Sequence, residues 1–413
     1  MSIQPRLDHL DGPGARSARY EKQRARIVDA AVTLVNDKGV GGMTLQQVAQ
    51  ALDLTTTSVT YYYRYKEQLA AAVFEDTLHR LATMVRDAAK EASPRARVAS
   101  YVQSYFDQFA RVMRGEDRPL AILSEIRTLE ERTRRPLIEQ YQNIFRDVRS
   151  LFGNVDTPER KRLYSARAQL LNEALFWSAM WLRRYPLGDL PNIRRRMLDV
   201  LENGIAGPNA SWPMEVIDPD ADVPDDAKHE FLRVANRLIN DIGYKGASVD
   251  RIVGELKITK GSFYHHLDAK DDLILECYQN DYRRLGRLQL LIRGLGGPVA
   301  RKLASGIASV LNLQFDGVHP LLRTTALQAM PKVVRVAAIE RFDRSALWLS
   351  GLLVDGMADR SIRLVDPMIA ANIIISTINS AYDLRSWARQ QTRDEAIDIY
   401  AGVLMRGLLD HDR

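Results

Sequence analysis

The sequence of 413 residues has one cysteine, Cys277, and no long run of apolar residues. A single cysteine excludes an intramolecular disulfide framework and any cysteine-rich zinc or iron–sulfur site. The longest weakly polar run, Met368 to Ile378, is too short to cross a bilayer. Residues 1–20 lack the apolar core of a secretory signal. We therefore expect a cytoplasmic protein that has no membrane partner.

Signatures of common enzyme classes are also missing. The sequence has no HExxH, no GxSxG and no Walker A loop, since Lys260-Gly261-Ser262 has the wrong order for one. Cys277 has no evident catalytic base and is interpreted as a buried structural thiol. We expect neither an enzyme nor a bound cofactor or metal. Charged residues make up 27% of the chain and the net charge is +6, a balance that permits a nucleic-acid partner.

The sequence does contain an internal repeat. Residues 24–69 align without a gap on residues 228–273, and 11 of the 46 positions are identical. Ordinary residue usage would give roughly three identities by chance. The identical pairs include Asn36/Asn240 and Gly39/Gly243. The period is too long for a solenoid, so the sequence indicates two homologous modules fused in tandem.

Each module is expected to be entirely helical, because apolar residues recur at helical spacing and no run alternates as a strand would. In the first repeat unit Gly39 ends a longer helix, and Thr44 with Gln47 forms a capping box before a short helix. A tight turn at Asp53 follows, and Thr55 opens a third helix. A long helix followed by two short ones is typical of a helix-turn-helix DNA reader.

The segment between the modules differs in composition. Residues 206–226 hold four prolines and six acidic residues but no lysine or arginine, as expected of an extended linker. An ordinary surface loop is the alternative. The predicted division of the chain is a flexible arm (1–19), a first DNA-binding head (20–68), a first helical body (69–205), the linker (206–225), a second head (226–272) and a second body (273–413).

The second head resembles a known family. Residues 259–273 (TKGSFYHHLDAKDDL) are similar to the recognition-helix signature of the TetR/AcrR family of bacterial transcriptional regulators. Residues 355–367 (DGMADRSIRLVDP) are similar to the helical body of that family. The first head, residues 55–69 (TTTSVTYYYRYKEQL), is a looser match, with Thr57 where the signature has glycine. The resemblance implies two modules, each a three-helix DNA-binding head on a helical body for ligand binding and dimerisation.

The turn inside each head departs from the family pattern. Asp53 and Lys257 stand where the family usually has glycine. Asparagine and aspartate tolerate a left-handed backbone better than other side chains, so lysine is the less suited of the two. Val59 and Tyr63 are predicted to face the core of the first head.

The resemblance and the chemistry of the side chains select candidate DNA contacts. The candidates for reading base edges are Thr56, Thr57 and Tyr61 in the first head and Lys260, Gly261 and His265 in the second. Threonine methyls can touch the thymine methyl and lysine can donate to guanine. The caps can contact phosphate, and Tyr62, Tyr264 and His266 can contact phosphate or sugar. Thr44 and Ser248 have the alternative role of helix caps alone. The candidates are Thr44, Thr55, Thr56, Thr57, Tyr61, Tyr62, Lys66, Ser248, Thr259, Lys260, Gly261, Tyr264, His265, His266 and Lys270.

The family usually works as a homodimer of single-module chains. The resemblance therefore implies an intramolecular pseudo-dimer, in which the last helices of each body pair. A further dimer of two chains is left open. Because the two heads differ, we expect a double-stranded operator that is pseudo-palindromic or asymmetric. We expect a repressor; the alternative is a ligand-binding or protein-interaction module in which one or both heads do not bind DNA.

Family members commonly hold a small effector in the body, and we expect a largely apolar one here. Apolar cavities with a few polar groups are the usual ligand sites, but aromatics at helical spacing are more often plain core. The candidate pocket residues are Tyr105, Phe109, Tyr141, Phe145, Trp177, Trp181, His319, Trp348 and Tyr382.

Overall fold

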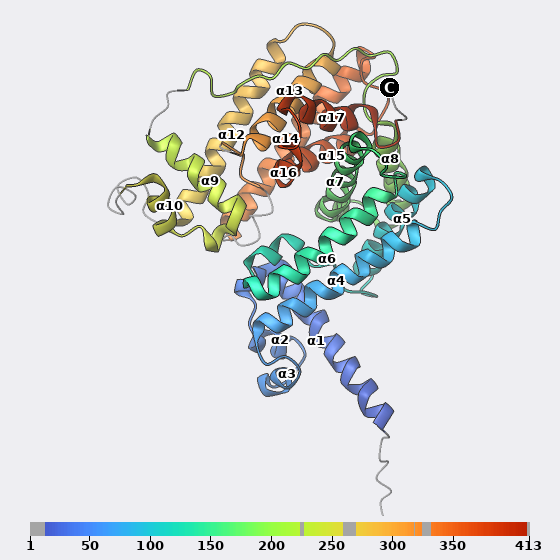
Figure 1. Cartoon of the computed structure of the whole chain (residues 1–413), viewed down its shortest axis with the longest axis vertical. Helices are drawn as coiled ribbons and strands as arrows, with labels where there is room; N and C mark the ends of the chain where they lie inside the picture. The colour runs from blue at the N-terminus through green and yellow to red at the C-terminus, as the bar shows by residue number, and fades with distance from the viewer. Residues whose placement is uncertain (1–12, 224–226, 259–269, 318, 324–331, 411–413) are drawn as a thin grey trace, which may run out of the picture. The chain divides into compact units, whose positions relative to one another are not determined.

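The computed structural model describes residues 13–223, 227–258, 270–317, 319–323 and 332–410 (Figure 1). Every regular element in these ranges is a helix, as predicted, and one isolated antiparallel bridge joins Ala206 to Ile362. No described helix is both long and apolar enough to span a membrane. The chain forms two compact units, one of Met1–Thr77 and Arg118–Leu137 and the other of Leu78–Asp117 and Ile138–Arg413.

The first unit contains the first head. Its complete helices are α1 (Pro13–Gly42), α2 (Leu45–Ala51), α3 (Thr56–Tyr62) and the 3-10 helix η1 (Leu123–Thr128). Helices α4 (Lys66–Ala88) and α6 (Glu131–Ser150) begin in it. Because α1 begins at Pro13, residues 13–19 of the expected flexible arm are helical, and residues 1–12 lie outside the described residues.

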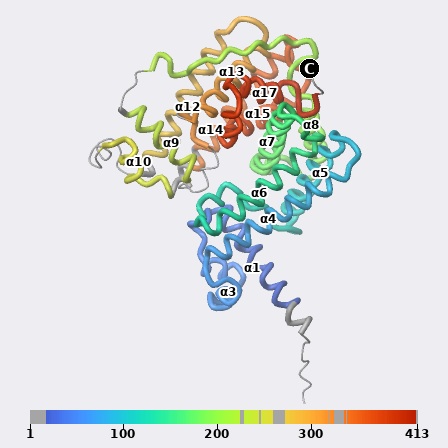
Figure 2. Tube along the Cα trace, in the orientation of Figure 1, coloured from blue at the N-terminus to red at the C-terminus, as the bar shows by residue number. Residues whose placement is uncertain are grey.

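The second unit contains most of the first body, the second body and the described part of the second head (Figure 2). Its further elements are α5 (Pro94–Met113), α7 (Pro158–Trp181), η2 (Leu182–Arg184), η3 (Leu187–Asp189), α8 (Leu190–Asn203), α9 (Ala227–Gly246), α10 (Val249–Leu256), α12 (Lys270–Gly294), α13 (Val299–Asp316), α14 (Lys332–Ala358), α15 (Pro367–Ser380), η5 (Ala381–Leu384), α16 (Arg385–Ala388) and α17 (Arg393–Arg406).

The repeat in the sequence corresponds to a repeat of backbone conformation. Gly39 and Gly243 interrupt α1 and α9 at φ 67° and 75°, so each long helix is kinked where its repeat partner is. The turns after α2 and α10 place Asp53 at φ 54° and Lys257 at φ 55°. Both non-glycine residues therefore adopt the left-handed conformation that the sequence pattern predicts, at a steric cost that is larger for lysine.

Helices from the two bodies pack together in the second unit. Helix α7 lies against α15 and α17, and α8 lies against α15. Every residue from Ser165 to Leu175 of α7 and from Ile369 to Ile374 of α15 is buried. A helix that is buried all round belongs to the interior of a fold, so the contact between the two bodies is part of the core.

Reciprocal backbone hydrogen bonds join the ends of α8 and α17. The amides of Ile205 and Ala206 donate to the carbonyl of Met405, at 3.0 and 2.9 Å. In the opposite direction the amides of Leu408 and Leu409 donate to the carbonyls of Leu201 and Glu202, at 2.7 and 3.4 Å. Corresponding segments of the two modules thus donate to each other in both directions, and the Ala206 bond has its direct counterpart in the Leu409 bond, as expected of an approximate two-fold contact.

Two glycines permit this crossing. Gly204 has φ 65° and Gly407 has φ 98°. A Cβ built on Gly204 would lie 2.3 Å from the Met405 carbonyl oxygen, and one on Gly407 would lie 2.3 Å from that of Glu202. The positive φ and the close approach of the other backbone each exclude a side chain at these two positions.

The segment between the modules is held against the second body. The amides of Glu215 and Ile217 donate to the hydroxyls of Ser305 and Ser309 on α13, at 3.1 and 2.9 Å. Asp220 pairs with Arg284 and Arg287 of α12 at 2.6 and 2.5 Å. The described part of the linker therefore follows the surface of the second body over most of its length.

Replacing Gly407 by alanine is expected to destabilise the protein by about 3 kcal/mol, because the new methyl meets backbone atoms and the positive φ is unfavourable. Thermal unfolding measures the effect. The matched control is Gly351→Ala on the exposed face of α14, where a Cβ has no atom within 4 Å and the helix gains up to about 1 kcal/mol. Equal melting temperatures for the two variants would contradict the prediction.

Candidate functional site

The predicted caps of the first head are formed by side chains at the starts of α2 and α3. The Thr44 hydroxyl accepts from the Gln47 amide at 3.1 Å and the Gln47 side chain accepts from the Thr44 amide at 3.2 Å, which confirms the capping box. The Thr55 hydroxyl accepts from the Ser58 amide at 3.2 Å. Thr44 and Thr55 remain exposed, as do Thr56 and Thr57.

Helix α3 has one face in the core of the head and the other in solvent. Val59 and Tyr63 are buried, as predicted. Tyr61 is 74% exposed, an unusual position for a large aromatic side chain. The exposed side of α3 therefore presents Thr56, Thr57 and Tyr61 together, which brings the three base-reading candidates of this head onto one surface.

Tyr20 of α1 contacts this surface and was missed by the sequence analysis. Its ring centroid lies 4.8 Å from that of Tyr62 and 6.2 Å from that of Tyr61. Arg19 and Lys22, its neighbours on α1, are exposed. The signal in the sequence was the basic stretch Arg16 to Arg26, which precedes the first apolar stripe of the repeat.

Two polar contacts join α1 to the residues that follow α3. Arg24 of α1 donates to the Tyr63 hydroxyl at 3.1 Å, and burial raises the pKa of that hydroxyl. The Lys66 ammonium donates to the Gly41 carbonyl at 3.3 Å. Lys66 was predicted to contact DNA; in this structure its charge lies at the end of α1, close in sequence to the Thr44 cap.

The second head is described in part. Ser248 caps α10 by accepting from the Arg251 amide at 3.3 Å. Lys270 is the first residue of α12. The candidates outside the described residues are Thr259, Lys260, Gly261, Tyr264, His265 and His266.

Each head is joined to its own body by the same asparagine. The Asn36 amide group donates to the Leu120 carbonyl at 2.9 Å and accepts from the Ile122 amide at 3.0 Å. Asn240, its partner in the repeat, donates to Leu321 and accepts from Arg323, both at 2.9 Å. We call these two contacts the head–body joints. They give a physical reason for the Asn36/Asn240 identity.

The joints differ at one position. In the first module the Ala121 amide donates to the Thr77 hydroxyl at 2.9 Å. In the second the Leu322 amide donates to the carboxylate of Asp281, the repeat partner of Thr77, at 2.6 Å. Asp281 also accepts from Asn236 at 3.0 Å. Burial raises the pKa of Asp281 to about 6, against the opposing effect of Arg284.

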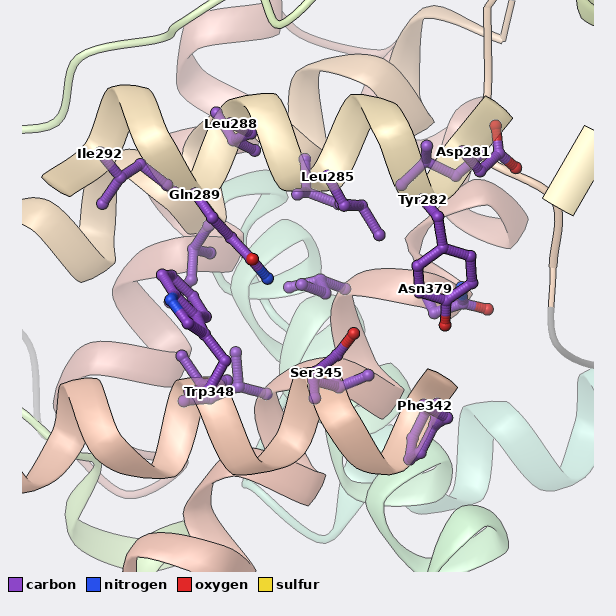
Figure 3. Close-up of a pocket in the computed structure, with 18 of the residues that line it drawn as sticks. Asp281, Tyr282, Leu285, Leu288, Gln289, Ile292, Phe342, Ser345, Trp348 and Asn379 are labelled. Carbon is purple, nitrogen blue, oxygen red and sulfur yellow. The ribbon is translucent and has the colours of Figure 1, made fainter. Parts of the chain in front are cut away.

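A cavity of about 150 Å³ lies in the second body, bounded by α12, α13, α14 and α15 (Figure 3). Its walls are mostly apolar, and Asp281, Leu321 and Leu322 of the head–body joint are among its lining residues. The lining also includes Trp348, one of the predicted pocket residues. The cavity is therefore directly adjacent to the contact that holds the second head.

The other predicted pocket residues have different surroundings. The Tyr382 hydroxyl donates to Asp241 at 2.9 Å, and the backbone carbonyl of His319 accepts from Arg284. Trp177 stacks on Phe342, a lining residue of the cavity, at 6.2 Å between ring centroids. In the first body Tyr105, Phe109 and Trp181 are buried, whereas Tyr141 and Phe145 are partly buried.

A buried carboxyl group of the first body lies where α7 meets the second body. Glu173 is 9% exposed and accepts from Gln169 at 3.3 Å. Burial and the nearby charge of Asp383 raise the pKa of Glu173 to about 8, although Arg323 opposes the change. The group is therefore mostly protonated at neutral pH, and it was not among the residues that sequence reasoning singled out.

The similarity to known proteins coincides with the two repeated segments. The family model for bacterial regulatory proteins of the tetR family matches residues 27–73 and 231–277. The chain is 30% identical over 173 residues to the HTH-type transcriptional regulator BetI of Paraburkholderia phymatum, covering 41% of this chain and 84% of that protein. It is 31% identical over 170 residues to BetI of Burkholderia thailandensis, covering 40% and 82%.

Among solved structures, the crystal structure of the TetR family transcriptional regulator PfmR from Thermus thermophilus is similar over 42% of this chain and 96% of that chain, with 19% identity and a TM-score of 0.32.

Stability should fall between about pH 4.5 and 8, because Glu173 binds its proton more tightly in the folded than in the unfolded state. The protonated carboxyl stabilises the fold at low pH, and this contribution is lost as the pH rises. Glu173→Gln, which mimics the protonated acid, should match the parent near pH 5 and exceed it at pH 9, by up to about 5 kcal/mol. Melting temperatures across this range measure it, and parallel pH profiles for the two proteins would refute it.

Proposed function

The chain belongs to the TetR family of bacterial regulatory proteins, and from this premise we propose that it is a repressor whose two modules bind one operator as an intramolecular pseudo-dimer. Regulators of this family are non-enzymatic DNA-binding proteins. The chain differs from a single-module regulator in having two family matches. One chain can therefore supply both heads that a two-fold operator needs.

The observation that carries the pseudo-dimer is the reciprocal crossing of α8 and α17. Corresponding segments of the two modules exchange backbone hydrogen bonds there in both directions, as two subunits do across a two-fold axis. The packing of α7 on α15 and α17 extends the same contact through buried residues. Two-fold regulators bind half-sites about 34–36 Å apart, and a pseudo-dimer would present one head to each half-site.

The first head is proposed to read bases with Thr56, Thr57 and Tyr61. Their exposure on one side of α3 supports this role, since phosphate contacts position a protein but base contacts specify the sequence. Arg19 and Lys22 of α1 are suited to the adjacent phosphates. In the second head the sequence has lysine, glycine and histidine at the matching positions, so the two half-sites are expected to differ.

The cavity of the second body is proposed to hold the effector that releases DNA. Asp281 and Leu322 line the cavity and are hydrogen-bonded to each other in the head–body joint. A ligand that fits the cavity better when these groups move apart shifts the position of the second head. Such a ligand must favour one head arrangement over the other, since equal affinity for both changes nothing.

Footprinting on DNA selected from random sequence should show two protected half-sites of unrelated sequence for one chain. Binding should weaken steeply with salt, by about 0.9 logarithmic units per neutralised phosphate and tenfold change in salt. Protection of a single half-site would count against the pseudo-dimer, and the absence of any salt-dependent binding to DNA would favour a module that does not bind DNA.

Tyr61→Ala should weaken operator binding about tenfold and relax the preference at one half-site, because an exposed base contact of this kind contributes about 1–3 kcal/mol. Lys260→Ala should instead affect the other half-site. Leu364→Ala, at an 83% exposed position on the second body, is the control and should leave the affinity unchanged. Gel-shift titration with each half-site scrambled in turn separates these outcomes.

A further inference from the structure

We propose that the cavity of the second body binds an amphipathic anion, with a carboxylate or phosphate group at an arginine-lined mouth and an apolar chain inside. This inference rests on the proposed function, because it names the chemical class of the effector. It is carried by the mouth, by the cavity wall and by one buried hydroxyl group.

The mouth opens between α12 and α14 and is basic. Arg283, Arg341 and Arg344 line it, and no carboxylate is among its lining residues. Arg341 lies over the ring of Tyr282, with 4.7 Å between the guanidinium carbon and the ring centroid. Within the described ranges none of the three arginines forms an ion pair. Three guanidinium groups that have no ion pair among the described residues favour an anion at this opening, and guanidinium pairs with carboxylate or phosphate in a bidentate geometry.

The mouth leads directly into the cavity. Tyr282, Gln289, Ser345 and Trp348 line both spaces, and Figure 3 shows these four side chains facing the gap between the two helices. Gly286 also lines the mouth, and a Cβ there would have no atom within 4 Å. A chain-like ligand can therefore extend from the arginines into the interior.

All four helices contribute apolar side chains to the interior wall. Leu288, Ile307, Leu352 and Ile374 represent the contributions of α12, α13, α14 and α15. Apolar cavities of about 150 Å³ stay dry and accept apolar molecules. Such a wall binds a hydrocarbon chain and disfavours a second charged group.

One polar atom in the wall has no partner. The Tyr278 hydroxyl is buried, and it accepts or donates no hydrogen bond within the described structure. Tyr278 lines the cavity next to Asp281, whose carboxylate is occupied by Asn236 and the Leu322 amide. A buried hydroxyl without a partner is costly, so a ligand oxygen that reaches it gains a hydrogen bond at little desolvation cost.

A cationic ligand is disfavoured by the same features. It would meet three arginines at the entrance, and the acid in the wall, Asp281, already has hydrogen-bond partners. Like charges brought together at a binding site cost affinity, whereas a complementary charge also raises the rate of association.

The test is isothermal titration of the full chain, without DNA, with four probes of equal chain length below their micellar concentrations. Decanoate and decyl phosphate carry the anionic groups, decanol is neutral and decyltrimethylammonium is cationic. We expect at least one anion to bind ten times more tightly than decanol, and the cation to bind more weakly than decanol. Equal affinity for the anions and decanol, tighter binding of the cation, or no binding of any probe would overturn the inference.

Arg341→Gln with Arg344→Gln should lower anion affinity 10- to 100-fold and change decanol affinity less than twofold, as expected for loss of charge-assisted hydrogen bonds. Arg293→Gln, at an exposed arginine of α12 outside the lining, is the matched control and should have no effect. Gly286→Phe should block the mouth and weaken every probe. Normal anion binding by Gly286→Phe would contradict the proposed entry past the arginines. An equal loss of anion and decanol affinity in the double variant would contradict it as well.

Operator binding is measured separately by gel shift with and without the tightest probe. Anion binding to a chain that does not bind DNA would refute the proposed repressor and leave the ligand class standing. DNA binding by a chain that binds no anion would refute the ligand class and leave the proposed DNA-binding function standing.

Discussion

The structure depends on the crossing of two backbones at Gly204 and Gly407. No side chain fits there, and the helices that end at these glycines belong to different modules. The hydrogen bonds on either side of the crossing run in both directions and involve the main chain, so they do not depend on which side chains the modules carry. The side chains of the modules are therefore free to differ elsewhere while the crossing keeps its geometry.

Much of the fold could be predicted because its signals are local. The caps at Thr44, Thr55 and Ser248, the kinks at Gly39 and Gly243 and the left-handed turn residues all act within a few positions of themselves. The repeat strengthened these signals, because the glycine kink, the cap and the turn residue occur at matching positions in both modules. The exposed threonines of α3 followed from the same helical periodicity.

The remaining features depend on contacts between distant parts of the chain. The partners of Asn36 lie 84 and 86 residues away, and those of Asn240 lie 81 and 83 residues away. The sequence showed that this asparagine was repeated but not what it holds. Tyr20 was missed because it precedes the aligned segment. Of the nine predicted pocket residues, Trp348 alone lines the cavity, because aromatic residues at helical spacing line a core and a pocket alike.

The difference between Thr77 and Asp281 suggests how a fused pair can respond to one ligand. Threonine holds its joint with a neutral hydroxyl, but aspartate holds the other with a buried carboxylate beside a cavity. A buried charge is costly to retain, and a ligand that alters its surroundings changes the stability of that joint more than of the neutral one. In the proposed pseudo-dimer, displacing one head is sufficient to weaken binding to the operator. Simultaneous binding of two tethered heads strengthens attachment by roughly 10²–10⁴ over one, and that factor is lost as soon as either head leaves its half-site.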